Sequence, residues 1–408
     1  MNLQARVNTD GLRSVVVLIV VGFVSLTPIG TQADNIVEII DSSGDGMGNP
    51  FDGPYGVAVD ERGNVYVAGW NSDNAFKITP GGEVTQIIDA SGDGLGHVLN
   101  SPPRVALDAS GNVYVTGWAS HNAFKITPAD AITQVIDYSG DGLGNLLGGT
   151  ESIAVDGSGN VYVTGWQTDN AFKITPGGVI TEIIDSSGDG LGNILDVAYG
   201  LAVDESGYVY VTGFDSDNAF KITPSGVITE IIDSSGDGLG NTLDAAHNIA
   251  VDGWGNVYVA GYFSHNAFKI TPAGSVTEII DSSGDSLGNG LHNAEGVATD
   301  GFGNVYVTGF RSHNAFRITP EGLITEIIDS SGDGLGNVLA GPHGIASDAS
   351  GNVYLVGNLS DNAFSIRASG PAVPALGTWG VICLVVVLLT VSIVLTRRLP
   401  EERSYDMS

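Results

Sequence analysis

Oxygen-bearing side chains recur in a short glycine-rich segment, Asp-x-Ser-Gly-Asp-Gly-x-Gly-Asn, that returns throughout the chain. In the copy that begins at Asp185, oxygen side chains stand at positions 1, 3, 5 and 9, and Gly190 stands at position 6. This order follows the first part of an EF-hand-type calcium loop. Because the bidentate Glu of position 12 is missing from every copy, we expect weak Ca²⁺ binding, in the millimolar to high-micromolar range.

The candidate calcium ligands are the Asp, Ser and Asn side chains of six copies, with an Asp at position 12 in three of them. They are Asp41, Ser43, Asp45, Asn49, Asp52, Asp89, Ser91, Asp93, Asp137, Ser139, Asp141, Asn145, Asp185, Ser187, Asp189, Asn193, Asp196, Asp233, Ser235, Asp237, Asn241, Asp244, Asp329, Ser331, Asp333 and Asn337. Ser286 replaces glycine in the copy that begins at Asp281, which makes that copy the least suited. The alternative is that these side chains cap backbone N–H groups of a turn without metal.

A second recurring segment, Gly-aromatic-x-Ser-(Asp/His)-Asn, pairs a ring with an acid or an imidazole. Its rings are Trp70, Trp118, Trp166, Phe214, Tyr262 and Phe310, with Asn358 in the last copy. Such a set can hold a sugar or a cationic ligand, whereas packing between sheets is the alternative. By contrast, we assign no shared place in the repeat to His97, His247, His292 and His343, and interpret them as incidental surface residues or satisfied interior residues.

The spacing of these segments indicates the architecture that must position them. The Asp that opens the glycine-rich segment and the Asn that opens NAFKITP both recur every 48 residues, seven times each. One unit holds four β-branched segments, at 57–60, 64–69, 75–79 and 84–89, separated by turn residues. Four strands per unit predict an all-β, seven-bladed β-propeller with four-stranded blades. The Asp that ends each first strand, Asp60 through Asp348, is expected to cap its own turn.

The phase of the repeat predicts how the ring closes. Residues 35–40 read as a fourth strand without earlier partners, and the last unit stops after its third strand. We therefore expect the N-terminal strand to complete the last blade, which leaves no open edge between the blades.

The two ends of the chain read as targeting segments. Residues 1–33 resemble a secretory signal peptide, with Arg6 and Arg13 before an apolar run. The propeller is predicted over 34–368 and a linker over 369–378. A single transmembrane helix is predicted over 379–396, before a cytoplasmic tail over 397–408. These features predict an exported protein of the cell envelope that is anchored to the membrane with its propeller outside the cytoplasm.

The unit GVAVDERGNVYVAGW…NAFKITPGG resembles bacterial NHL-like, SBBP-type β-propeller repeats. Val373-Pro374-Ala375-Leu376, the apolar run and Arg397-Arg398 resemble the IPTL-CTERM sorting signal, although Ala375 stands where Thr is usual and the tail continues to Ser408. The first resemblance implies a propeller that serves as an enzyme, a ligand binder or a scaffold. The second implies an exported protein.

Composition and symmetry narrow the function. The net charge is −31, so nucleic acid is excluded as an expected partner and cations are favoured. Catalysis needs groups with different roles, whereas the units differ mostly by conservative exchanges. We therefore expect a monomeric, membrane-anchored binding or scaffold module with calcium loops and a carbohydrate or protein ligand. A metal-free surface protein and a propeller hydrolase or lyase are the alternatives.

Overall fold

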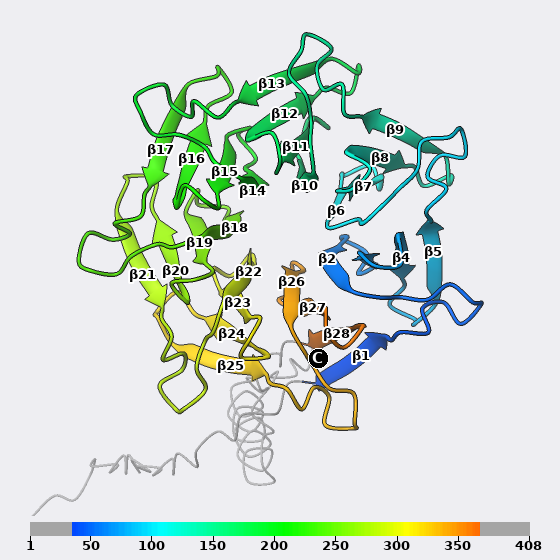
Figure 1. Ribbon diagram of the computed structural model, residues 1–408. Helices are drawn as coiled ribbons and strands as arrows, with labels where there is room; N and C mark the ends of the chain where they lie inside the picture. The colour runs from blue at the N-terminus through cyan, green and yellow to red at the C-terminus, as the bar shows by residue number, and fades with distance from the viewer. Residues whose placement is uncertain (1–34, 368–408) are drawn as a thin grey trace, which may run out of the picture. The chain divides into compact units, whose positions relative to one another are not determined.

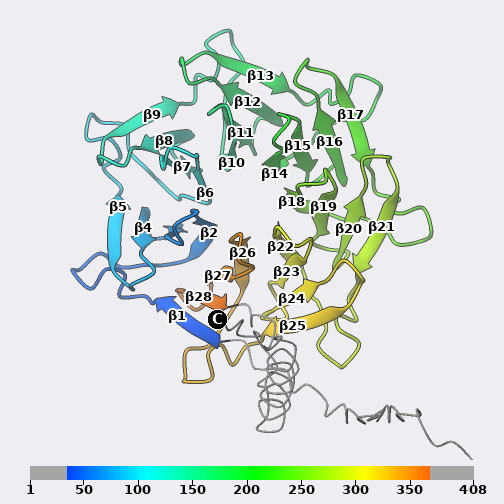
Figure 2. The same ribbon diagram turned by 180° about the vertical axis from the view of Figure 1, so that it is seen from behind.

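The computed structural model describes residues 35–367, which form seven four-stranded antiparallel sheets around a central axis (Figures 1 and 2). The predicted seven-bladed propeller is confirmed. The signal peptide, the linker, the transmembrane helix and the tail predicted from the sequence lie outside the described residues. Between residues 35 and 367 there is no helix long and apolar enough to cross a membrane.

Each blade places its first strand beside the axis and its fourth strand at the outer edge (Figure 1). The innermost strands of blades 1 to 7 are β2 (Pro54–Val59), β6 (Val105–Leu107), β10 (Thr150–Val155), β14 (Ala198–Val203), β18 (Ala246–Val251), β22 (Ala294–Thr299) and β26 (Pro342–Ser347). The second strands are β3 (Val65–Gly69), β7 (Val113–Gly117), β11 (Val161–Gly165), β15 (Val209–Gly213), β19 (Val257–Gly261), β23 (Val305–Gly309) and β27 (Val353–Gly357).

The third strands begin at the repeated Asn, and the outer strands carry the Ile-Ile pair. The third strands are β4 (Asn74–Ile78), β8 (Asn122–Ile126), β12 (Asn170–Ile174), β16 (Asn218–Ile222), β20 (Asn266–Ile270), β24 (Asn314–Ile318) and β28 (Asn362–Arg367). The outer strands are β5 (Val84–Ile88), β9 (Ile132–Ile136), β13 (Ile180–Ile184), β17 (Ile228–Ile232), β21 (Val276–Ile280), β25 (Ile324–Ile328) and, in blade 7, β1 (Asn35–Ile40).

The ring closes as the phase of the repeat predicts. Strand β1 pairs antiparallel with β28, so blade 7 runs in the order β1-β28-β27-β26. The Asn362 side chain also donates to Glu38 Oε1 at 2.8 Å, a bond that Asn170 and Glu182 make within blade 3. The N-terminal strand thus gives the last blade both the backbone ladder and the side-chain contact of an ordinary blade.

The core lies between neighbouring blades. The Phe of each third strand, from Phe76 to Phe364, has no exposed surface in any blade. In the layer between blades 1 and 2, Tyr66 and Ile88 pack against Val115 and Phe124. Because the same kind of apolar layer lies between each pair of neighbouring blades, burial of apolar side chains holds the blades together, and the polar loop residues are not needed for this packing.

The first strands end one residue before the Asp, not at it as predicted, because that Asp closes the turn. Asp60 Oδ1 accepts backbone N–H groups from Arg62 at 2.9 Å and Asn64 at 2.8 Å. The corresponding Asp makes both bonds in each of the other six blades. The prediction that these Asp residues cap their own turns is confirmed.

Candidate functional site at the propeller axis

The two long loops of each unit lie side by side on one face, which places both candidate site segments there. The Asp or His of the second loop accepts a backbone N–H from the glycine-rich loop of the next blade, at 2.7–2.9 Å around the whole ring. Asp73, for example, accepts from Ser101, and His121 accepts through Nδ1 from Gly149. Either Asp or His can stand at this position because both side chains can accept this backbone hydrogen bond. These side chains therefore join neighbouring blades.

The glycine-rich loops have the hydrogen bonds of the capping alternative. Asp41 Oδ1 accepts from the backbone N–H of Ser43, and Asp45 accepts from Met47 N and Asn49 Nδ2 at 2.9 and 2.7 Å. The Asn49 amide lowers the pKa of Asp45. A Cβ on Gly44, whose φ is +64°, would lie 1.9 Å from Asn49 O, so glycine is required there.

The calcium prediction concerns these same side chains. Across the described part of the chain, no three His, Cys, Asp or Glu side chains are grouped to hold a metal ion. The predicted ligand sets of two Asp with Ser and Asn remain a prediction.

A different set of residues converges on the axis from one position at the start of the innermost strands. In order of blades, this position holds Tyr55, Pro103, Glu151, Tyr199, His247, Glu295 and His343. His247 and His343 therefore share a place in the repeat, contrary to the sequence interpretation. Of its two alternatives, surface residues or satisfied interior residues, the second holds for both, because they are buried and have polar partners. We call Tyr55, Arg104, Glu151, Tyr199, His247, Glu295 and His343 the axial cluster.

Blades 5, 6 and 7 contribute a His–Glu–His bridge. Glu295 Oε1 lies 2.6 Å from His343 Nε2 and 3.2 Å from His247 Nε2. All three side chains are buried, with at most 5% of their surface exposed. Burial raises the pKa of Glu295, lowers the pKa of His247 to about 4, and holds the pKa of His343 well below its usual range.

The neighbours of the two imidazoles determine where their protons lie. Arg104 Nη1 is 3.4 Å from His343 Nδ1, and a guanidinium only donates, so His343 is neutral and donates through Nε2. His247 faces oxygen on both sides, with its Nδ1 3.3 Å from the backbone carbonyl of Glu295. An additional proton must therefore lie between His247 and Glu295.

Across the axis, blades 2 and 3 hold an incompletely satisfied pair. Arg104 Nη1 also reaches the backbone carbonyl of Tyr55 at 3.4 Å, but Arg104 Nη2 has no partner among the described residues. Glu151 bonds with Tyr199, and its Oε1 is likewise without a partner there. Both side chains are buried, 8% and 3% exposed. Burial raises the pKa of Glu151 to about 7, against the opposing effect of the Arg104 charge.

The rings of the second loop surround this cluster, and we call Trp70, Trp118, Trp166, Phe214, Tyr262 and Phe310 the aromatic collar. Trp118 lies between Trp70 and Trp166, with ring centroids 5.5 and 5.6 Å apart. Tyr55 stacks on Trp70 at 4.8 Å, and His247 stacks on Tyr262 at 5.3 Å. The collar side chains are all half-buried. They pack between blades, as one alternative predicted, and still present part of each ring to solvent.

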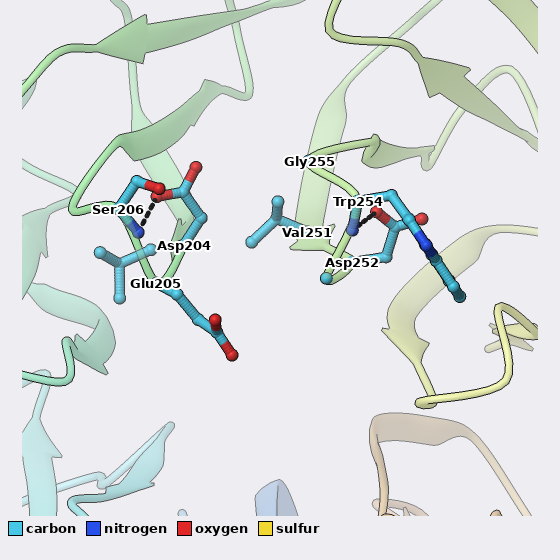
Figure 3. A pocket seen from close by; sticks show the side chains of 9 residues that line it. Asp204, Glu205, Ser206, Val251, Asp252, Trp254 and Gly255 are labelled. Atoms are coloured by element: carbon cyan, nitrogen blue, oxygen red, sulfur yellow. Dashed lines mark hydrogen bonds between the residues drawn. The ribbon is translucent and has the colours of Figure 1, made fainter.

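A cavity of about 360 Å³ lies at the far end of the innermost strands, between the turns that follow β14 and β18. Figure 3 shows Glu205 and Val251 between the two turns and the Trp254 ring pointing away from Glu205. Asp204 and Asp252, which also line it, are engaged in capping their own turns. The cavity therefore lacks the unpartnered buried groups that mark the axial cluster.

The axial cluster escaped sequence reasoning because each blade contributes a single side chain. A signal was present: at a position where a structural role would repeat one residue type, seven units show Tyr, Pro, Glu, Tyr, His, Glu and His. Arg104 stands one residue later, beside Pro102 and Pro103, where β6 is only three residues long. Because proline lacks the N–H needed for the ladder, the shortened strand has a physical cause.

Comparison with known proteins gives fold relatives only. No family model matches the chain, and no curated protein matches it. A solved streptogramin B lyase structure aligns with a TM-score of 0.65 at 16% identity, over 82% of this chain and 98% of that one. A catalytically inactive virginiamycin B lyase from Staphylococcus aureus with quinupristin gives 0.62 at 15% identity, over 82% and 99%. Hydrazine synthase from Kuenenia stuttgartiensis gives 0.57 at 16% identity, over 78% and 96%. At such identities the likeness shows a shared β-propeller fold.

Proposed function

We propose that this chain is an exported, membrane-anchored binding protein that holds a small organic molecule on the aromatic collar, above the axial cluster. One observation carries the proposal. The residue types differ from blade to blade at the axis, whereas each glycine-rich loop uses nearly the same residues. A structural role that is the same in all seven blades can be filled by the same residue type in each. An asymmetric ligand presents different groups to different blades, so its recognition requires different residue types.

The chemistry of this end of the axis suits an organic ligand. Half-exposed rings offer flat apolar surface, and buried polar groups beneath them offer hydrogen bonds and charge. A carbohydrate or an organic cation remains within the proposal, because aromatic faces bind both.

Tryptophan emission provides the test, because three of the collar rings are indoles. Trp254 lies on the opposite turns and is 61% exposed, so a Trp254→Phe variant reduces the background. Phenol titrated into this variant should change the emission saturably, with a dissociation constant of roughly millimolar order for so small a ligand. A linear, unsaturable response identical to that of free tryptophan would contradict binding at the collar.

A propeller enzyme using acid–base chemistry is the second candidate, and the axial cluster favours it. Glu151 has a pKa of about 7, in the range of a general acid or base, while His247, with a pKa of about 4, is neutral there. Groups with such separated pKa values are typical of catalytic sites, although structural networks also produce them.

The lyase with quinupristin among the structural relatives suggests a first substrate for this candidate. Wild-type protein and a Glu151→Gln variant would be incubated with quinupristin, and its loss followed by chromatography. Consumption by the wild type alone would support an enzyme that uses Glu151. If quinupristin persists equally in both samples, the protein does not act on this molecule. Ligand binding without catalysis would then stay the proposed function of the collar.

The calcium loops are a separate part of the proposal. Two Asp per loop, with Ser and Asn beside them, supply hard oxygen ligands on a chain of net charge −31. Isothermal titration with CaCl₂ should give weak binding at up to six equivalent loops. Absence of heat at millimolar calcium would remove the metal from the proposed function.

A further inference from the structure

We infer that the ligand of the axial site presents a neutral N–H group beside a C=O group, as a primary amide does, and that Glu151 and Arg104 bind these two groups. This inference rests on the proposed binding at the collar and adds the chemical class of the ligand. Two polar atoms carry it: Arg104 Nη2, which can only donate, and Glu151 Oε1, which accepts when the carboxyl group is ionised.

These two atoms are the unusual feature of the cluster. The imidazoles of His247 and His343 and the carboxyl of Glu295 satisfy one another across blades 5 to 7. Arg104 and Glu151 belong to neighbouring blades, and the guanidinium is near enough to lower the carboxyl pKa. Leaving a buried polar group without a partner costs about 1–3 kcal/mol, and more when the group is charged. A group that meets both atoms recovers this energy on binding.

Charge selects among ligands that share a ring. A cation would accept nothing from Arg104 and would lie against a guanidinium. An anion would bring a second set of acceptors to Glu151, whose ionised oxygen needs a donor. A neutral amide donates to Glu151 and accepts from Arg104 without adding charge to a buried site, where an unpaired charge is costly.

The route to the pair passes the aromatic collar. Both atoms are shielded from solvent, whereas Tyr55, which contacts Arg104, Tyr199, which contacts Glu151, and Trp118 are half-buried. We therefore expect a ligand to displace a ring as it enters. Trp118 is placed to report this, since its Nε1 lies 3.1 Å from the position of a Cβ on Gly149, two residues before Glu151 in the sequence.

Three probes with one phenyl ring test the inference: benzamide, benzoate and benzamidine. Each would be titrated by tryptophan emission at pH 8, where Glu151 is largely ionised, into the full chain with Trp254→Phe. Benzamide should bind at least tenfold more tightly than either charged probe. Its affinity should also increase from pH 6 to pH 8, as the carboxylate becomes the stronger acceptor.

Removing the guanidinium should change the order. In an Arg104→Met variant the carbonyl loses its donor and the repulsion of a cation disappears, so benzamidine should overtake benzamide. Arg62→Met, on an exposed turn at the other end of the strands, removes the same charge and should leave the order unchanged. If Arg104→Met does not fold, Glu151→Gln serves instead. At pH 8 it should bind benzamide only as tightly as the wild type does at pH 6, because a neutral amide oxygen is a weaker acceptor than a carboxylate, and it should lose the pH dependence.

The outcomes separate the two proposals. Equal binding of the three probes, or tightest binding of benzoate or benzamidine by the wild type, would overturn the amide class and leave the collar as a binding site. Saturable binding of phenol without any binding of benzamide would do the same. If neither phenol nor any of the three probes gives a saturable response, the binding function itself fails.

Discussion

The axial cluster and the glycine-rich loops lie on one face of the propeller but were built in opposite ways. In the loops each unit repeats one solution, in which an Asp accepts the backbone N–H of the Ser two residues later in the same loop. At the axis, the units provide different side chains that bond only across blades. This contrast indicates that a repeat position with the same residue type in every blade serves the fold. A repeat position whose residue type changes from blade to blade is a candidate for a functional site.

The first prediction removes the acid that joins three blades. Glu295→Leu leaves the Nε2 atoms of two buried imidazoles without a partner, and each buried polar group that loses its partner costs about 1–3 kcal/mol. We expect the melting temperature to fall by roughly 5–10 °C. Asp285→Asn lies in the loop that connects blades 5 and 6. It removes the carboxylate charge and the oxygen that accepts from the Asn289 amide, and should cost at most about 1 kcal/mol. Calorimetry measures both melting temperatures. An equal decrease in the two variants would show that the axial cluster contributes no more to stability than a glycine-rich loop does.

The second prediction uses the pKa of Glu151, which is raised to about 7 in the folded protein. The folded state therefore keeps a proton that the unfolded state has lost, so the contribution of this group to stability declines as pH rises from about 4.5 to 7. Glu151→Gln has no such proton. Relative to wild type, the variant should gain about 3 kcal/mol in free energy of unfolding between pH 4.5 and pH 8.

Denaturant titrations at the two pH values measure this gain, with Glu205→Gln as the matched control on an exposed turn. His247 acts in the opposite sense: its lowered pKa makes its contribution decline as pH falls from about 6.5 to 4. Because Glu151→Gln leaves His247 in place, the difference between variant and wild type isolates the carboxyl group. A difference that does not change with pH would show that Glu151 titrates normally.

The third prediction concerns the collar. Trp118→Leu removes the central ring of three contacting indoles and should weaken phenol binding about fivefold, the equivalent of one aromatic contact of about 1 kcal/mol. The remaining collar indoles, Trp70 and Trp166, report the titration. Trp254→Leu, on the opposite turns, should leave the affinity unchanged. Similar effects of both substitutions would place the ligand elsewhere.

The smallest expected effect belongs to a single calcium loop. At 1 mM calcium and a dissociation constant of about 1 mM, each occupied loop contributes about 0.4 kcal/mol. The double variant Asp185→Asn, Asp189→Asn should therefore lower the calcium-dependent stabilisation by about that amount and the titration stoichiometry by one. Loss of all calcium response in this variant would show that the loops do not act independently.

The amino-acid sequence alone was enough to predict the propeller, the number of blades and the closing strand. Each of these follows from local patterns: a 48-residue period, β-branched segments between turn residues, and a terminal strand out of phase with its unit. The turn caps at Asp60 and its equivalents were equally predictable, because an Asx turn is made within a few residues.

The axial cluster, in contrast, could not be predicted without the arrangement of the blades in space. His247, Glu295 and His343 are 48 residues apart in sequence and meet because ring closure brings the starts of the innermost strands together. Whether the Glu151 carboxyl group has a hydrogen-bond partner depends on which side chains the other blades place within reach of it. Burial then moves the pKa values, and no single unit contains the neighbours that cause it.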